Sequence, residues 1–532
     1  MMNFLQRIFP LPLLLLIFFV QAVAMLINFD VYDTREIAIV LCWVPIFTLI
    51  HYYSQSKIVY YVLITLFFIE GLLTLIHWII LKGPLTASSL FVLLNTNLDE
   101  ATDFVQLKFN YYYLMVLPYV GLFFYALKKQ NTIIEQQPKN YLYATFLLLP
   151  IGFVTENYVN DRFVRKGVPQ TIEAFISFAE EVKSYNKLKK RTVQQVGAKL
   201  NINHTKGNTF VLILGESANR NHMSVYGYSK ETNPKLKKRS DIIFYDDVVS
   251  AYSVTFKSVL SMLTNSTIEN NLNIDEAVSL IDVFHSAGFK TYWISNQSPI
   301  GVWDNAIYNL AQTSDQVVFV NKFGNSSFES TYLASFDEMI FEPLQTVLQD
   351  DKKNRFVVVH LMGSHSSYNK RYPSTFNKFN NHSSDKEQLI NEYDNSILYN
   401  DYIVDSVFTM LNNAANKNQH QLFSSIYLSD HSENVYDENN HVGHDYAGTM
   451  PKSNVEIPFV LWVSEEFKQQ ELVYQTIVKN KNQPFVTDDL FHAIIDLNQI
   501  DYIGLNQKCS VFNTNYIPRK RVLEDGRDYD LN

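Results

Sequence analysis

The sequence predicts two dissimilar parts: an N-terminal transmembrane domain of five helices, and an extracytoplasmic α/β domain with a mostly parallel sheet. Three observations predict this. Only 17 of the 97 charged residues lie in 1–160, the same region contains five long apolar stretches, and strand-like and helix-like patterns alternate from residue 208 onward. The expected boundaries are 1–160 for the membrane part, 161–206 for an amphipathic connector and 207–532 for the α/β domain.

The composition excludes several classes of protein. The chain has 532 residues, a formal net charge of −9, 47% hydrophobic residues and two cysteines. A chain this rich in hydrophobic residues is not disordered, and two cysteines cannot build a disulfide scaffold. The acidic balance excludes a basic nucleic-acid binder, so no nucleic-acid partner is expected. Too much polar chain follows the apolar part for a purely polytopic transporter.

Five apolar stretches are long enough to cross a bilayer, which takes about 20 residues. They run over residues 9–29, 36–53, 58–81, 110–127 and 141–158. The first is too long for a signal peptide, and no small-residue cleavage site follows it, so we expect it to be retained as a helix.

Basic residues beside the short loops set the expected orientation. With a cytoplasmic N-terminus, one side of the membrane holds Arg7, Lys57, Lys128, Lys129 and Lys139. Five crossings then place the remainder of the chain outside the cytoplasm. The alternative is that one stretch is a buried core helix, which would put the large domain inside. In the connector, the amphipathic segment Gln170–Leu188 either lies in the membrane interface or packs on the α/β domain.

Short apolar runs predict buried strands, and longer amphipathic segments between them predict helices. This alternation is typical of a mostly parallel sheet that is covered on both faces. The expected strands are Thr209–Leu214, Thr291–Ser295, Phe356–Leu361, Ser424–Leu428 and Phe459–Val463. The expected helices are Phe256–Leu263, Val278–Ala287, Phe336–Leu348 and Asn400–Asn413. In such sheets the functional residues collect at the carboxyl ends of the strands.

Three of the expected strands are followed by polar clusters. The candidate side chains in these clusters are Glu216, His365, Asp430, His431, His441 and His444. Carboxylates and imidazoles at one sheet edge are the donors that a divalent cation needs. Taken singly, Asp430 could cap a helix, His365 could be a turn residue and Glu216 could be a solvated loop acid. Their joint position at strand ends favours a metal site.

The order and spacing of these clusters resemble a known family. It is the membrane-anchored phosphoethanolamine transferases of Gram-negative bacteria, within the alkaline phosphatase and sulfatase superfamily. The resemblance extends over essentially the whole chain. The similar blocks are Leu214–Arg220 with Tyr226–Tyr228 and Glu231–Pro234, then His360–His365 with Lys370–Pro373, and finally Leu428–Glu433.

In the family a threonine at the start of a helix is both metal ligand and nucleophile, about forty residues after the glutamate. Here Ser250, Ser253 and Thr255 compete for that role. Thr255 fits best, because it follows Glu216 by 39 residues and directly precedes the expected helix Phe256–Leu263. A helix N-terminus places partial positive charge near an attacking oxygen and a phosphate. The alternative is that Thr255 only caps the helix.

The resemblance implies one divalent ion bound by Glu216, Thr255, Asp430 and His431. Zinc is the ion implied by the family, although a carboxylate-rich set also suits manganese or magnesium.

The resemblance further assigns His365 and His444 to catalysis and substrate binding, and Asn233 to substrate binding. These two histidines would protonate the leaving oxygen, hold the phosphoryl oxygens or bind a second ion. His444 matches the position of the family's second histidine better than His441 does.

The implied reaction transfers phosphoethanolamine from phosphatidylethanolamine to lipopolysaccharide through a covalent phospho-enzyme. Both substrates are membrane lipids, so the resemblance implies a multi-pass inner-membrane protein, expected to be a monomer, with its catalytic domain in the periplasm. Lipid A-modifying relatives carry several disulfides in that domain. This chain can form none there, which places it closer to the branch that modifies the lipopolysaccharide core.

Other functions stay open at this point. A phosphoglycerol transferase or another sulfatase-superfamily phosphodiesterase acting on a membrane lipid is the nearest alternative. A sulfatase would need a Cys/Ser-x-Pro-x-Arg context, and none surrounds Thr255. A non-catalytic scaffold would not need an intact set of candidate ligands.

Overall fold

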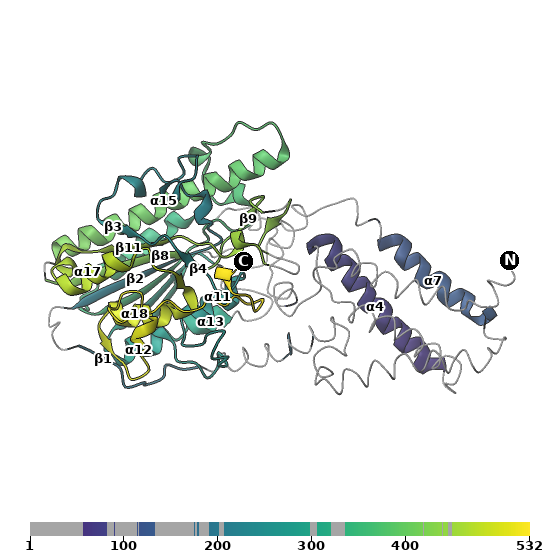
Figure 1. Cartoon of the computed structure of the whole chain (residues 1–532), viewed down its shortest axis with the longest axis horizontal. Coiled ribbons are helices and arrows are strands. Elements are labelled where there is room, and N and C mark those ends of the chain that lie inside the picture. The colour runs from purple at the N-terminus through teal and green to yellow at the C-terminus, as the bar shows by residue number, and fades with distance from the viewer. Residues whose placement is uncertain are drawn as a thin grey trace. The chain divides into compact units, whose positions relative to one another are not determined.

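The computed structural model describes residues 57–81, 90, 114, 116–133, 175, 178–179, 191–201, 207–297, 306–320, 336–418, 420–438, 440–444 and 450–531 (Figure 1). They fall into two compact units. One unit contains the helices α4 and α7, and the other contains the described residues from 191 onward. Of the connector segment Gln170–Leu188, only residues 175 and 178–179 are described.

The first unit pairs α4 (Lys57–Leu81) with α7 (Val116–Ile133). Their contact is aromatic: the ring of Phe68 stacks on Phe123 at 3.8 Å between centroids and on Tyr119 at 5.3 Å. The two helices overlap the predicted stretches 58–81 and 110–127, whereas 9–29, 36–53 and 141–158 lie outside the described residues. Within the described ranges, no helix combines the length and apolarity that a membrane crossing requires. The count of five helices therefore stays a prediction.

The second unit is built on a seven-stranded mixed sheet. The strand order is β3–β11–β8–β2–β7–β5–β6, in which β11 runs antiparallel to both of its neighbours and the other pairings are parallel. In that order the strands are Ile242–Phe244, Phe459–Val463, Leu422–Ser429, Asn208–Gly215, Arg355–His360, Lys290–Ser295 and Gln316–Phe319. All eight residues of the central strand β2 are buried, as expected for a parallel strand covered on both faces.

Helices cover both faces of this sheet (Figure 1). On one face, α14 (Phe341–Leu348) and α15 (Asp385–Lys417) pack their apolar side chains against the central strands. On the other face, Phe284 of α12 (Leu280–Ser286) stacks on Phe356 of β7 at 4.2 Å between ring centroids. The remaining helices are α11 (Thr255–Met262), α13 (Ala306–Ala311), α16 (Glu465–Lys468), α17 (Glu471–Asn480) and α18 (Leu490–Leu497).

Three short two-stranded ladders complete the described strands. They pair β1 (Lys199–Leu200) with β13 (Ile500–Asp501), β4 (Val248–Val249) with β12 (Phe485–Val486), and β9 (Asn434–Val435) with β10 (Val442–Gly443). We call the described residues 434–438 and 440–443, which contain the last of these ladders, the β9–β10 hairpin.

All five predicted strands are present, but β3 and β6 were not predicted. Both are edge strands of three and four residues, and none of their residues is fully buried, so they lack a continuous apolar run. The predicted helix Asn400–Asn413 is only the second half of α15, which begins at Asp385. In the first half, buried polar side chains such as Asn391, Asp394 and Asn395 interrupt the apolar pattern.

The sheet register brings three loops together at one edge. Leu214 of β2 lies beside His360 of β7, and Gly215 lies beside Ser429 of β8. The residues that follow each strand therefore emerge side by side, as expected for the carboxyl ends of parallel strands.

Candidate active site and metal centre

Four side chains meet at this edge. The hydroxyl oxygen of Thr255 lies 3.2 Å from Oε2 of Glu216 and 3.1 Å from Nε2 of His431. The same Nε2 atom lies 3.2 Å from Oε1 of Glu216 and 3.5 Å from Oδ2 of Asp430. Glu216 follows β2, Asp430 and His431 follow β8, and all three are at most 1% exposed.

The donor atoms of this group fit a divalent cation. Ligand atoms around a tetrahedral zinc ion are roughly 3.3 Å apart, close to the spacing of the Thr255, Glu216 and His431 atoms. Asp430 accepts hydrogen bonds through Oδ1 from the backbone N–H groups of Ser217 and His431, whereas its Oδ2 is buried and accepts none from the described residues. The Nδ1 atom of His431 lies 2.9 Å from the carbonyl of Ser432, which fixes the ring with Nε2 toward the carboxylates.

The buried carboxylates of Glu216 and Asp430 favour positive charge on the groups beside them. Burial, with the nearby charge of Glu216, raises the pKa of Asp430 to about 7. Burial also disfavours the His431 imidazolium, but the charges of Asp430 and Glu216 outweigh this effect and raise its pKa to about 10. Burial opposes ionisation of Glu216 as well, yet the hydrogen bond and charge of His431 hold its pKa far below the ordinary range. A bound divalent cation would satisfy both carboxylates.

The structure distinguishes Thr255 from its two competitors. Thr255 is the first residue of α11, and Val254 rather than Thr255 is the N-cap, without a side-chain capping bond. The hydroxyl of Ser250 is fully buried and donates to the carbonyl of Asp430 at 2.7 Å. The hydroxyl of Ser253 donates to Glu524 at 3.4 Å. Of these three hydroxyls, the described contacts join only that of Thr255 to Glu216 and His431.

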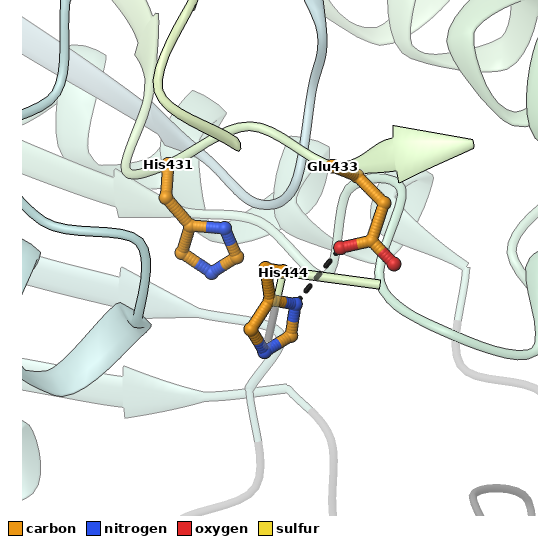
Figure 2. Close-up of side chains that lie close together, drawn as sticks. All are labelled: His431, Glu433 and His444. Carbon is orange, nitrogen blue, oxygen red and sulfur yellow. Dashed lines mark hydrogen bonds and ion pairs between the residues drawn. The ribbon is translucent and has the colours of Figure 1, made fainter. Parts of the chain in front are cut away.

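A second group of potential ligands shares His431 with the first. Donor atoms of His431, Glu433 and His444 lie within 4.8 Å of one another. Figure 2 shows the imidazole rings of His431 and His444 close together, and Nδ1 of His444 lies 2.8 Å from Oε2 of Glu433. Glu433 received no role from the sequence, although it follows His431 by only two residues in the same loop.

The other predicted site residues lie in different surroundings. His365 is half-buried, and its charge helps to lower the pKa of Glu216, which places it near the centre. Asn233 is fully buried and hydrogen-bonds with Ser224 and Thr232, neither of which belongs to the centre. The backbone carbonyl of His441 accepts a hydrogen bond from Tyr436, and among the described residues His441 is not part of either ligand group.

The loop after β7 braces Glu216 through its backbone. The N–H of Ser364 donates to the carbonyl of Glu216 at 2.9 Å. The buried carboxylate of Asp337 accepts from the N–H groups of Met362 and Gly363, at 2.8 and 2.9 Å. Gly363 has φ +55°, and a Cβ atom at this position would lie 2.6 Å from the carbonyl oxygen of Glu216.

We expect Gly363→Ala to damage the centre. The added methyl group meets backbone atoms of Glu216, which cannot rotate away, so Glu216 must move. The expected results are a stability loss of about 1–3 kcal/mol and a loss of metal affinity of roughly 10–100-fold. Thermal unfolding and metal titration of the purified chain measure both.

Gly288→Ala is the matched control for this substitution. Gly288 also has a positive φ, +84°, but in the described part of the chain no atom beyond its two sequence neighbours lies within 4 Å of the position that an added Cβ atom would take. It should cost stability without changing metal affinity. Equal metal affinity in the Gly363→Ala and Gly288→Ala variants would contradict the bracing role of the loop.

Comparison with known families identifies this arrangement. The family model described as sulfatase matches residues 208–500, which include the sheet and all of the predicted site residues. The chain belongs to the sulfatase family. The α/β unit is thus an alkaline phosphatase/sulfatase-like domain, as the sequence motifs predicted, and its sheet is mixed because β11 runs antiparallel to its neighbours.

Within this family the chain is similar to phosphoethanolamine transferases, which confirms the resemblance seen in the sequence. It is 25% identical over 513 residues to the phosphoethanolamine transferase EptC of Escherichia coli strain K12, covering 90% of this chain and 86% of that protein. The periplasmic domain of E. coli EptC, solved as a complex with Zn, superposes with a TM-score of 0.58 at 26% identity over 64% of this chain and 97% of that structure. These relatives are enzymes, so the chain belongs with catalysts rather than with scaffold proteins.

A membrane-protein structure extends the likeness in fold. The integral membrane protein lipooligosaccharide phosphoethanolamine transferase A of Neisseria meningitidis gives a TM-score of 0.68 at 20% identity, covering 93% of this chain and 95% of that one. At this identity the likeness concerns the fold alone.

Proposed function

We propose that the chain transfers phosphoethanolamine from phosphatidylethanolamine to lipopolysaccharide, on a core sugar or lipid A, with Thr255 as the nucleophile. The observation that carries the proposal is the position of the Thr255 hydroxyl, at the first residue of α11 and within 3.2 Å of both His431 and Glu216. A hydroxyl among metal-binding side chains at a helix N-terminus is suited to attack on phosphorus. The similarity to EptC over 90% of the chain supports the same chemistry.

The residues proposed to hold a divalent metal are Glu216, Thr255, Asp430 and His431. Such an ion would lower the pKa of the threonine hydroxyl and offset negative charge on the phosphoryl group. We propose zinc, because the related E. coli domain was solved as a complex with Zn and the donor set is nitrogen and oxygen. Manganese and magnesium are the alternatives to be compared in metal titrations.

In the first step the hydroxyl oxygen of Thr255 forms a bond to phosphorus, and the bond from phosphorus to the diacylglycerol oxygen breaks. The threonine loses its proton, and the diacylglycerol oxygen gains one. His365 and His444 are the proposed proton donors and phosphoryl-oxygen ligands, because both are half-buried imidazoles whose charge acts on Glu216. The product is phosphoethanolamine on Thr255, with diacylglycerol released.

In the second step a hydroxyl or phosphate oxygen of the lipopolysaccharide attacks the same phosphorus atom. The bond from phosphorus to Thr255 breaks, and the threonine oxygen regains a proton through a histidine, either from an attacking hydroxyl or, where a phosphate oxygen attacks, from water. Asn233 is assigned to substrate binding by the family resemblance alone.

The lipid substrates and the apolar N-terminal part together suggest where the enzyme lies. We propose a multi-pass inner-membrane protein with a transmembrane domain over residues 1–160, a connector over 161–206 and a periplasmic catalytic domain over 207–532, acting as a monomer. The likeness in fold to an integral membrane protein over 93% of the chain supports a membrane domain. A platform in the membrane would keep both lipids near Thr255.

Reporter fusions test this topology. A fusion after Ile133 should report the cytoplasm, because Lys128, Lys129 and Lys139 flank that position. A fusion after Leu200 should report the periplasm. The same signal at both positions would contradict the topology and access to periplasmic lipids.

The reaction itself is tested with the purified full chain, defined donor lipids and lipopolysaccharide. Mass spectrometry should find phosphoethanolamine on the lipopolysaccharide when phosphatidylethanolamine is the donor. Phosphatidylglycerol serves as the comparison donor. Transfer of phosphoglycerol instead would favour the alternative reaction, and transfer of neither headgroup would contradict a lipid phosphotransferase.

A further inference from the structure

One buried histidine, His222, belongs to neither ligand group of the candidate centre. His222 ends the short 3-10 helix η2 (Arg220–His222) and is 3% exposed. Its Nδ1 atom lies 2.6 Å from Oδ1 of Asp394, and its Nε2 atom lies 3.1 Å from Oδ1 of Asp437. Both ring nitrogens therefore face carboxylate acceptors. Neutral imidazole has only one N–H group, so only the imidazolium can donate to both.

Asp394 ties His222 to the helix α15. The second oxygen of Asp394 accepts from Lys230 at 2.6 Å and from Tyr228 at 3.0 Å. The neighbouring residue Tyr393 uses its hydroxyl to bind the loop of the centre: it donates to the carbonyl of Ser217 and accepts from the N–H of Asn219. We call the contacts of His222 with Asp394 and Asp437 the clamp. Its α15 side is thus fixed to the loop that follows Glu216.

Asp437 ties His222 to the β9–β10 hairpin. Its carboxylate accepts from the backbone N–H of Val435 at 2.9 Å, and Asn219 bridges it to the backbone carbonyl of Glu433. Glu433 directly precedes the hairpin and His444 directly follows it. The placement of both side chains therefore depends on how this hairpin is held.

We propose that His222 is a positioning residue: by donating to Asp394 and Asp437 at once, it fixes the β9–β10 hairpin and thereby places Glu433 and His444 at the centre. The proposal deepens the proposed function and rests on it, since His444 is assigned there to substrate and proton transfer. His222 itself is assigned no contact with a reacting atom.

The charges around His222 predict a pH dependence for this clamp. Burial disfavours the imidazolium, but hydrogen bonds and charge from Asp394 and Asp437 raise the pKa of His222 to about 9. The pKa of His222 in the folded chain is above its ordinary value of 6.5. Both hydrogen bonds of the clamp are therefore fully formed below pH 6.5, and they are lost as the pH rises through about 9. When His222 loses its proton, the hydrogen bond to Asp437 should break first, because it is the longer of the two.

Two tyrosine phenols that face His222 do not titrate in this window. Tyr228 and Tyr393 pack on the imidazole with ring centroids at 4.8 and 5.0 Å. Burial raises the pKa of both phenols far above the ordinary value of a tyrosine. Lys230 faces the same site only through Asp394.

Hydrogen exchange of the full-length chain, corrected for the intrinsic effect of pH, tests the clamp without relying on catalysis. In the wild type, protection of the hairpin amides should fall by at least about 10-fold between about pH 7 and pH 10, while α12 amides stay protected. His222→Gln should show the low protection at every pH. Asp437→Asn removes one of the two carboxylates, so the fall should move to lower pH.

Transfer rates should fall in the same variants as hairpin protection does. The rate of His222→Gln should be roughly 10–100-fold lower than that of the wild type, as for other residues that orient a metal site. The exposed residue His382, changed to Gln, is the matched control and should behave as wild type. Unchanged hairpin exchange in His222→Gln would overturn the proposal. If that variant does not fold, an unshifted pH dependence in Asp437→Asn would overturn it instead. If exchange changes as expected but even the wild type transfers nothing, the clamp stands and the proposed function fails.

Discussion

Thr255→Ala is expected to abolish phosphoethanolamine transfer, by about 10⁴-fold or more, while the chain stays folded. The reason is chemical, because the alanine has no oxygen to attack phosphorus. The half-buried Thr255 side chain contributes little to the core, so the thermal unfolding temperature should change only slightly. Transfer rates and unfolding curves of the purified variant measure the two effects separately.

Two further variants sharpen this test. Thr255→Ser keeps the oxygen and should retain some activity. Ser253→Ala should remain active, because the Ser253 hydroxyl donates to Glu524 rather than facing Glu216 and His431. Full activity in Thr255→Ala would contradict the double-displacement mechanism, whereas loss of activity only in Ser253→Ala would move the nucleophile by two residues.

Removal of a metal-binding side chain should have an effect of similar size by a different route. Glu216→Gln, Asp430→Asn and His431→Ala each remove one of four proposed ligands, so bound metal and transfer should be lost together. The loss of charge matters most for Asp430, whose Oδ2 atom is buried without a hydrogen bond. Metal content after dialysis and transfer rates are the two measurements.

Asp401→Asn provides the matched control. Asp401 is also a buried carboxylate, and its two oxygens accept hydrogen bonds from the backbone N–H groups of Lys235 and Leu236. An asparagine oxygen can accept only one of these bonds, so this variant should lose some stability. This variant should keep both metal and activity. If the Glu216, Asp430 and His431 variants retain wild-type metal content, the metal centre is not where we place it.

Apolar patterning in the sequence predicted the buried strands of the sheet. Strands such as β2 and β11 are continuous apolar runs. The polar loops with Glu216 and Asp430 follow two of the predicted strands, β2 and β8. In the first half of α15, which was not predicted, buried amides and carboxylates such as Asn391, Asp394 and Asn395 lie between the apolar side chains. Asn395 accepts hydrogen bonds from the backbone N–H groups of Lys378 and Phe379, a contact with a separate loop that helical periodicity does not report.

The site was predictable where one motif holds neighbouring ligands, and less so where distant loops cooperate. Asp430 and His431 are adjacent, and Thr255 was proposed from the spacing that the family resemblance implies and from the helix that follows it. Glu433 received no role, because its part depends on the β9–β10 hairpin returning His444 to within 2.8 Å. No local pattern reports that return of the chain.

The most direct measurement is mass spectrometry of the full-length protein after incubation with phosphatidylethanolamine and no acceptor. We expect phosphoethanolamine on the peptide that contains Thr255, and its disappearance when lipopolysaccharide is added. Thr255→Ala should carry no adduct. An adduct-free wild type that nevertheless transfers phosphoethanolamine when the acceptor is present would contradict the covalent mechanism.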